Sequence, residues 1–269
     1  MSPAEPPAGA TGLARIPPAS ADSYRSRFAA AALAEEYESN YAPGTYDSWI
    51  WDLQRSYLED LLARRLPADG GRYLDFACGS GRVISFVEPK VREAIGVDVS
   101  PHMLELAREK VERAALIHTD LTADRGAVTG KFDLITAFRF LLHSEPELRS
   151  AALTTIRDLI ADDGTLVVNV HGNAHSLRAI PWAFRRYILR QGVKQLSLRQ
   201  TRAILEQSGF RVVEARGFGL VIARLYRLLG RRLSEMIERA TRFRPIERLC
   251  VDLILVCEPK SEARSRPGG

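Results

Sequence analysis

Short apolar runs alternate with helix-like segments through the middle of this chain, and this alternation limits the possible folds more than any other feature. Strands that are apolar on both faces and that alternate with helices are typical of a parallel sheet covered by helices on both sides. The sequence therefore predicts an α/β fold. The expected strands are 72–76, 94–98, 115–119, 132–138 and 165–170, and the expected helices are 82–87, 101–113 and 148–160.

The flanking segments predict one elaborated domain between two tails. Residues 1–22 hold five of the 14 prolines, and residues 259–269 are polar, so we expect both tails to be disordered. The domain, 23–258, is expected to begin with a helical lid at 23–66 and to carry inserts at 171–196 and 218–248. A helix at 197–208 and strands at 210–215 and 249–257 complete the predicted elements.

The most specific motif is Asp75-Phe76-Ala77-Cys78-Gly79-Ser80-Gly81, which lies where the first expected strand gives way to a helix. Glycines in such a turn let the backbone approach a ligand, and the start of the helix offers unpaired N–H groups. Asp75 comes at the carboxyl end of the strand, where α/β sheets open their ligand crevice. The motif predicts a ligand-binding turn.

A second acidic residue, Asp98, ends the next expected strand, 23 residues after Asp75. A carboxylate at this place can accept two hydrogen bonds from a ribose diol. Nicotinamide-binding folds also place an acid about 20 residues beyond their glycine turn, so this pair alone predicts only a nucleoside-binding crevice. An aspartate at a strand end can also simply cap the following helix, and this alternative stays open for Asp98 and for Asp120.

Together these motifs resemble those of the class I S-adenosylmethionine-dependent methyltransferases over residues 73–170. The signature of that family is an acid followed by three alternating glycines, and Ala77 replaces the first of them. A dinucleotide dehydrogenase would favour a tighter turn with a further glycine that this chain lacks. The resemblance implies a seven-stranded, mostly parallel Rossmann-like sheet with helices on both faces and an antiparallel last strand.

The resemblance also implies which residues bind the cofactor, S-adenosyl-L-methionine. Its methionine portion would lie at Asp75 and at the backbone of the glycine turn, and its ribose would lie at the end of the second strand. Its adenine would lie beside Met103 and after the third strand. The implied cofactor-binding residues are Asp75, Ala77, Gly79, Gly81, Asp98, Val99, Met103, Asp120 and Leu121.

Histidines follow the fourth and fifth expected strands, on the edge that faces the transferred methyl group in the family. If the acceptor is a hydroxyl, a base must take its proton, and the pKa of histidine suits this task near neutral pH. His143 is the first candidate, and His171, with His175 close by, is the second. Helix capping or a backbone contact is the structural alternative for each of them.

Basic residues are concentrated in the inserts, since residues 171–248 carry 17 Lys or Arg against five Glu and no Asp. This charge suits an anionic or membrane-adjacent acceptor. Arginine is also common throughout the chain, because 33 of its 38 basic residues are Arg. The predicted function is methyl transfer to oxygen or nitrogen of a small-molecule or glycan-like acceptor in the cytoplasm, with no structural metal and with peripheral membrane contact as an open possibility.

Two alternatives remain. The positive charge would also suit an RNA methyltransferase, although Thr136-Ala137-Phe138-Arg139 stands where base-flipping enzymes carry Asn-Pro-Pro-Tyr. A partner protein that binds the cofactor without turnover, or a peripheral membrane scaffold, is the alternative outside catalysis. Tyr41, Tyr46 and Arg55 could close over the cofactor, but surface packing is the favoured interpretation for these three residues.

Overall fold

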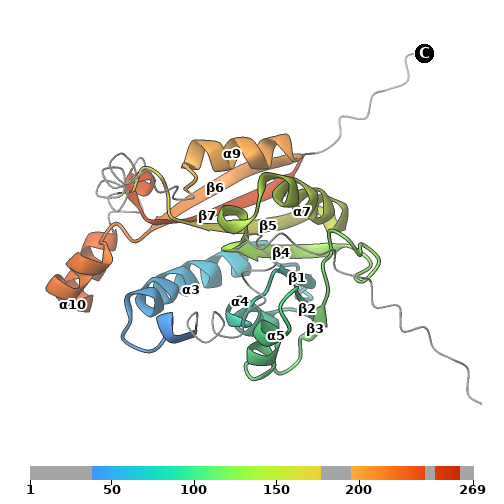
Figure 1. Cartoon of the computed structure of the whole chain (residues 1–269), viewed down its shortest axis with the longest axis horizontal. Helices are drawn as coiled ribbons and strands as arrows, with labels where there is room; N and C mark the ends of the chain where they lie inside the picture. Colours follow the sequence, from blue (N-terminus) through green and yellow to red (C-terminus); the bar gives the residue numbers. More distant parts are fainter. Residues whose placement is uncertain (1–37, 177–194, 240–245, 261–269) are drawn as a thin grey trace, which may run out of the picture.

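The computed structural model describes residues 38–176, 195–239 and 246–260, which form one seven-stranded sheet with helices on both faces (Figure 1). The order across the sheet is β3-β2-β1-β4-β5-β7-β6. Strands β1 to β5 are parallel, and β7 runs antiparallel to both of its neighbours. This confirms the predicted fold class. The strands are β1 Arg72–Phe76, β2 Glu93–Asp98, β3 Ala115–His118, β4 Phe132–Phe138, β5 Ile160–His171, β6 Phe210–Phe218 and β7 Asp252–Pro259.

The helices cover the two faces of the sheet as two separate layers (Figure 1). Alternate residues of each strand point to opposite layers: in β7, Leu253 and Leu255 join the core beneath α7 and α9, whereas Ile254 and Val256 join the core beneath α3 and α4. The longer helices are α3 Tyr46–Arg65, α5 Pro101–Arg108, α7 Pro146–Leu159, α9 Leu198–Gln207 and α10 Ala223–Glu238; the shorter ones are α4 Arg82–Val87, η1 Glu88–Lys90, α6 Phe140–His143 and η3 Ile246–Leu249.

Capping residues fix where the helices begin. The side chains of Thr45, Ser100 and Ser197 each accept a backbone N–H in the first turn of α3, α5 and α9, and Ser197 forms a full capping box with Gln200. The capped starts of α5 and α9 agree with the sequence prediction.

Several predicted boundaries differ from the structure. The N-terminal segment is not one helix, because the chain turns through residues 41–45, where Gly44 has a φ of 87°, and α3 begins only at Tyr46. Strand β6 extends to Phe218, which pairs with Asp252, and not only to residue 215; α10, the helix of the 218–248 insert, begins at Ala223. The C-terminal tail predicted at 259–269 begins too early, because Pro259 is the last residue of β7. The predicted tail at 1–22, residues 261–269, the start of the lid at 23–37 and most of the 171–196 insert lie outside the described residues.

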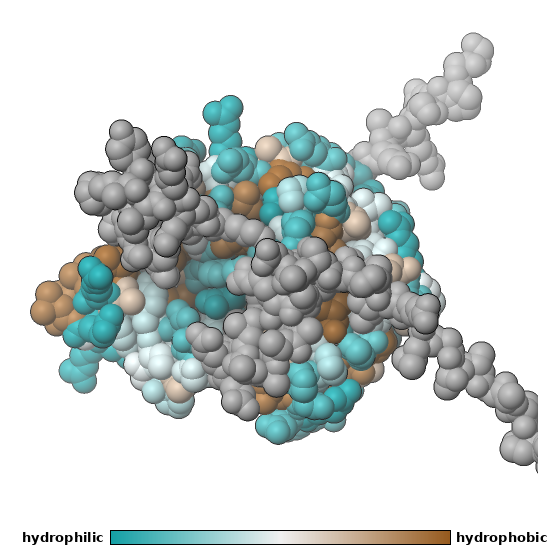
Figure 2. All heavy atoms as spheres, in the orientation of Figure 1, coloured by the Kyte–Doolittle hydropathy of each residue, from teal (hydrophilic) through white to brown (hydrophobic). Residues whose placement is uncertain are grey.

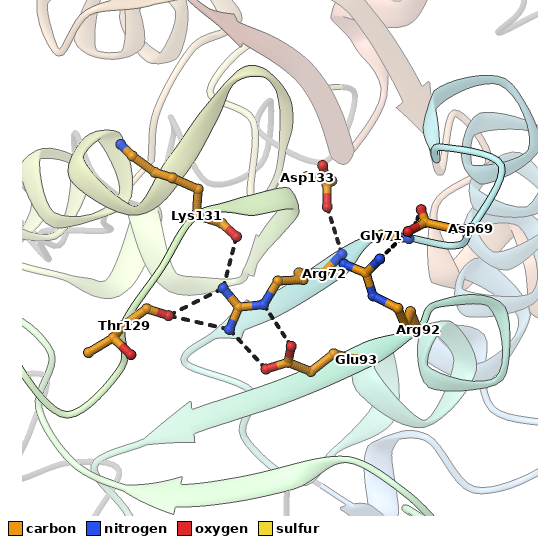
Figure 3. Close-up of polar contacts among 8 residues, drawn as sticks. All are labelled: Asp69, Gly71, Arg72, Arg92, Glu93, Thr129, Lys131 and Asp133. Atoms are coloured by element: carbon orange, nitrogen blue, oxygen red, sulfur yellow. Dashed lines mark hydrogen bonds and ion pairs between the residues drawn. The ribbon is translucent and has the colours of Figure 1, made fainter.

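The amino edge of the sheet is closed by a network around Arg72, drawn in Figure 3. The guanidinium of Arg72 donates two hydrogen bonds to Glu93, at 2.6 and 2.9 Å, and others to the carbonyls of Thr129 and Lys131. Asp133 accepts the backbone N–H of Arg72 at 2.7 Å. Asp133 therefore joins two strands at this edge.

Candidate active site

A pocket opens at the carboxyl edge of the sheet, where β1, β2 and β3 end. The chain builds the sheet outward in one direction from β1 and in the other from β4, so the strand order reverses between these two neighbours. Open α/β sheets bind ligands at such a switch point. Five of the predicted cofactor-binding residues line it: Ala77, Asp98, Val99, Asp120 and Leu121. The other residues that line it are Phe76, Val97, Thr119, Thr122, Phe140 and Leu148.

The glycine turn after β1 uses each of its small residues differently. Ala77 has a φ of 58°, in the left-handed region that favours glycine, at the place of the family's first glycine. A β-carbon on Gly79 would meet no atom within 4 Å, so this side of the turn faces open space. A β-carbon on Gly81 would lie 2.9 Å from the backbone of Ala107, so Gly81 lets α4 and α5 approach each other. Of the two glycines, only Gly79 combines the turn conformation with open space beside its α-carbon.

Asp98 links the glycine turn to α5. One carboxylate oxygen accepts the backbone N–H of Gly79 at 2.8 Å, and the other accepts that of Ser100 at 2.9 Å. The side chain is 6% exposed, and burial raises its pKa. A carboxylate has about four lone-pair sites, so both oxygens can still accept a donor from the pocket. The capping alternative for Asp98 is wrong, because the side chain of Ser100 caps α5, and Asp98 instead holds the backbone N–H groups of Gly79 and Ser100.

Of the residues predicted at the adenine end, Asp120 lines the pocket and Met103 does not. Asp120 follows β3, and one of its oxygens accepts both the N–H and the hydroxyl of Thr122, at 2.9 and 2.6 Å. This bond holds the carboxyl group at the wall of the pocket. Met103 is buried, its N–H donates to the Ser100 hydroxyl at 3.3 Å, and its side chain does not line the pocket.

Asp75 is buried beneath the glycine turn, with 1% of its surface exposed. One oxygen accepts the hydroxyl of Thr136 at 2.6 Å, and Thr136 is in turn 2.6 Å from the hydroxyl of Tyr73. The other oxygen has no hydrogen-bond partner among the described residues. Burial raises the pKa of Asp75 to about 7, although Thr136 and the nearby cation of Arg82 oppose the shift. An orphaned buried carboxylate oxygen is a suitable partner for a cationic ligand group.

The raised pKa of Asp75 predicts that the ligand-free protein loses stability as the pH rises. Well below pH 3.8 the carboxyl is protonated in both the folded and the unfolded state and does not change the stability. Between 3.8 and about 7 the unfolded chain loses its proton first, so stability falls as the pH rises. Replacing Asp75 with Asn should therefore remove a cost of about 2–4 kcal/mol at pH 8 and have little effect at pH 4. Urea unfolding at both pH values measures this difference, and equal pH dependence in the two proteins would contradict the prediction.

Two arginines that were not predicted as site residues, together with the rings of Tyr41 and Trp51, complete this end of the site. Arg82 begins α4 directly after the glycine turn, and Arg139 follows β4. The guanidinium of Arg82 lies 4.1 Å from the ring centroid of Tyr41 and 4.6 Å from that of Trp51, and Arg139 lies 5.1 Å from Tyr41. Tyr41 thus joins the ends of β1 and β4 through cation–π contacts.

Tyr46 and Arg55, which the sequence analysis considered as residues that could close over the cofactor, instead contact neighbouring parts of the protein. The hydroxyl of Tyr46 donates to the carbonyl of Val221 at 2.8 Å, and its ring packs against Trp49. Arg55 forms an exposed ion pair with Asp52. These contacts confirm the packing interpretation for Tyr46 and Arg55, whereas Tyr41 lies at the arginines.

The two histidines predicted as catalytic candidates lie side by side. Their Nε2 atoms are 3.1 Å apart and their ring centroids 4.7 Å apart, although His143 ends α6 and His171 ends β5. Phe140, one turn before His143 in α6, lines the pocket. His175 is exposed, four residues after His171. The structure therefore brings the two separately predicted histidines together as one imidazole pair, one helical turn from the pocket residue Phe140, although neither histidine lines the pocket itself.

The sheet order, the glycine turn and the acids at the strand ends define a Rossmann-like nucleoside-binding protein. The sequence pattern of the methyltransferase domain family matches residues 50–215, and the chain belongs to this family. The predicted membership of the class I S-adenosylmethionine-dependent methyltransferases is thus confirmed.

The chain is similar to the ubiquinone biosynthesis O-methyltransferase of Cereibacter sphaeroides, with 31% identity over 112 residues, which are 39% of this chain and 43% of that protein. It spans about half the length of the curated relatives that it matches. Among solved structures, magnesium protoporphyrin IX methyltransferase of Synechocystis with bound S-adenosylhomocysteine has a TM-score of 0.60 at 17% identity, covering 88% of this chain and 98% of that one. A TehB-like methyltransferase of Corynebacterium glutamicum has a TM-score of 0.54 at 15% identity, covering 85% and 97%. These structures support the fold.

Proposed function

We propose that this chain binds S-adenosylmethionine in the pocket at the carboxyl edge of the sheet. The carboxylate of Asp98 is placed to accept the ribose hydroxyls, and Asp120 lies at the adenine end of the same wall. The unpartnered oxygen of Asp75 fits the ammonium of the methionine portion, and the cations of Arg82 and Arg139 fit its carboxylate. The orphaned oxygen of Asp75 carries this proposal, because a buried carboxylate oxygen without a hydrogen-bond partner is costly unless a ligand supplies one.

Two glycine substitutions should separate ligand contact from helix packing. The side chain added by Gly79→Ala would enter open space above the turn and weaken cofactor binding by about tenfold or more, whereas Gly81→Ala would push α4 from α5 and cost about 1–3 kcal/mol of stability. Both positions have positive φ, so the backbone strain is matched. Calorimetry and urea unfolding of both variants provide the measurements. Unchanged affinity in Gly79→Ala would contradict contact of the cofactor with this face of the turn.

We further propose that the reaction is methylation of a hydroxyl on a small molecule. When bound, the cofactor supplies a methyl group on a positively charged sulfur, so the acceptor oxygen forms a bond to that carbon while the carbon–sulfur bond breaks and its electron pair stays on sulfur. The proton of the hydroxyl needs a base, and the pair of His143 and His171 provides an imidazole nitrogen for it. The basic residues of the two inserts favour an anionic acceptor.

Asp252 is proposed as a positioning residue for this pair. It lies directly opposite His171 in the antiparallel ladder of β5 and β7, so the two side chains share one face of the sheet with β-carbons about 4.5–5.5 Å apart. Asp252 is buried and also accepts the side-chain N–H of Gln54 at 3.2 Å. A buried carboxylate beside an imidazole stabilises its protonated form, as a base that accepts a proton requires.

The direct test is turnover with a panel of hydroxylated small molecules. Purified protein and S-adenosylmethionine should form S-adenosylhomocysteine in proportion to a methylated product with a mass gain of one methyl group, and the yield should depend on the acceptor. Cofactor binding without turnover across the panel and a metabolite extract would favour the non-catalytic alternative. Turnover restricted to amines would place the methyl group on nitrogen and remove the need for the histidine pair.

A further inference from the structure

Helix α10 presents large apolar side chains to solvent on the side away from the sheet. Leu228 is 80% exposed and Met236 is 63% exposed, and Leu225 and Leu233 are exposed as well. These residues recur at intervals of three within each half of the helix, so each half has one apolar outer stripe. Figure 2 shows brown apolar side chains beside teal polar ones where α10 projects at the left edge of the molecule. Single exposed leucines are ordinary, but a cluster of this kind marks an interaction surface.

Arginines flank this apolar stripe along the whole helix. Arg224, Arg227 and Arg232 are exposed, and in the part of the chain that the structure describes none of them forms an ion pair with a carboxylate. Arg231 differs, because it is paired with Asp52 at 3.2 Å and with Glu235 at 2.7 Å. The outer face of α10 therefore combines apolar side chains with three cations that form no ion pair among the described residues.

The inner face of α10 is fixed to the protein, so the outer face has a defined orientation. Glu238 is buried and accepts the backbone N–H groups of Gly219 and Val221, at 3.1 and 2.8 Å. The ring of Tyr226 stacks on that of Trp49 with centroids 4.5 Å apart. These contacts lie on both sides of Gly230, whose φ of 71° and ψ of 172° kink the helix. Both halves are thus anchored by buried contacts while their leucines and arginines face outward.

We propose that the outer face of α10 docks the protein on an anionic lipid surface. Leucine and methionine would enter the boundary between headgroups and acyl chains, and the arginines would meet lipid phosphates, which is the arrangement of interfacial amphipathic helices. A second copy of the chain is a poorer occupant, because a symmetric contact would bring the arginines of α10 against each other. Within the described residues no helix is long and apolar enough to cross a bilayer, so the contact proposed is peripheral.

Vesicle binding tests this proposal. The full chain should sediment with vesicles of phosphatidylcholine containing 30% phosphatidylglycerol, and binding to pure phosphatidylcholine should be at least about tenfold weaker. The paired substitutions Leu228→Ser with Met236→Ser, and Arg224→Gln with Arg227→Gln, should each reduce binding by about tenfold or more. A matched control is Arg108→Gln with Arg199→Gln, which removes two exposed arginines outside α10 and should leave binding within about twofold.

Three outcomes would overturn the proposal: no binding to anionic vesicles, equal loss in the control, or a dimer in sedimentation velocity that the Leu228→Ser and Met236→Ser pair dissociates. The variants change only exposed side chains, so we expect their affinity for S-adenosylmethionine in calorimetry to be unchanged. An unchanged affinity would also show that the variants are folded. This measurement also keeps the two proposals separate. Vesicle binding without cofactor binding would reject the proposed function and retain the membrane surface, and the reverse result would reject only the membrane surface.

Discussion

Replacement of Asp98 with Ala should weaken S-adenosylmethionine binding by at least about 100-fold. The proposed ribose contacts are two hydrogen bonds to a charged acceptor, and each such bond contributes about 1.5–3 kcal/mol. The carboxylate also holds the N–H of Gly79 at 2.8 Å, so its loss frees the turn that faces the ligand. Isothermal titration calorimetry measures the affinity. The same substitution removes the side-chain contact to Ser100 at the start of α5, and we expect about 1 kcal/mol of lost stability as well.

The matched control is Asp133→Ala at the opposite edge of the sheet (Figure 3). Asp133 also accepts a backbone N–H, from Arg72 at 2.7 Å, so its removal should lower stability by a similar amount. The affinity for the cofactor should nevertheless stay within about twofold of the wild type, because the site lies at the other end of the strands. Equal affinities in both variants would show that Asp98 only holds the backbone of the glycine turn and of Ser100.

The sheet and the nucleoside end of the site could be predicted because both depend on short-range sequence patterns. Apolar runs of strand length fix the parallel strands, and the carboxyl ends of such strands necessarily share one edge. The proximity of Asp98 and Asp120 in one pocket could therefore be predicted without any information on long-range contacts. Met103 marks the limit of this reasoning, because its place in α5 was predicted but its side chain turned into the core.

What the sequence did not reveal depends on contacts between distant segments. Tyr41 contacts Arg82 and Arg139 because the chain turns through residues 41–45 before α3 begins. In the sequence, only Pro43 and Gly44 indicate this turn. An arginine directly after a glycine turn would have been a usable signal for Arg82. The pairing of Asp252 with His171 depends on the register of β7, and a register cannot be read from a strand that is apolar on both faces.

The histidine pair gives the second large effect, on the rate of methyl transfer. His171→Ala and His143→Ala should each lower kcat by about 10²–10⁴-fold, because one ring accepts the proton and the other holds it in position. The affinity for the cofactor should not change in either variant. The double variant should be little slower than the slower single variant, because residues that act as one unit are not additive. His175→Ala is the matched control: the residue is exposed four positions beyond His171 and should keep full turnover.

Asp252→Asn distinguishes a proton-accepting pair from a merely structural one. A carboxylate opposite His171 favours the protonated imidazole, so its neutralisation should move the acid limb of the pH–rate profile to lower pH while kcat falls less than in the histidine variants. A structural role would lower the rate at every pH without moving that limb. If both single histidine variants retained wild-type turnover, the acceptor would need no base, and a neutral amine nitrogen would become the better nucleophile for this pocket.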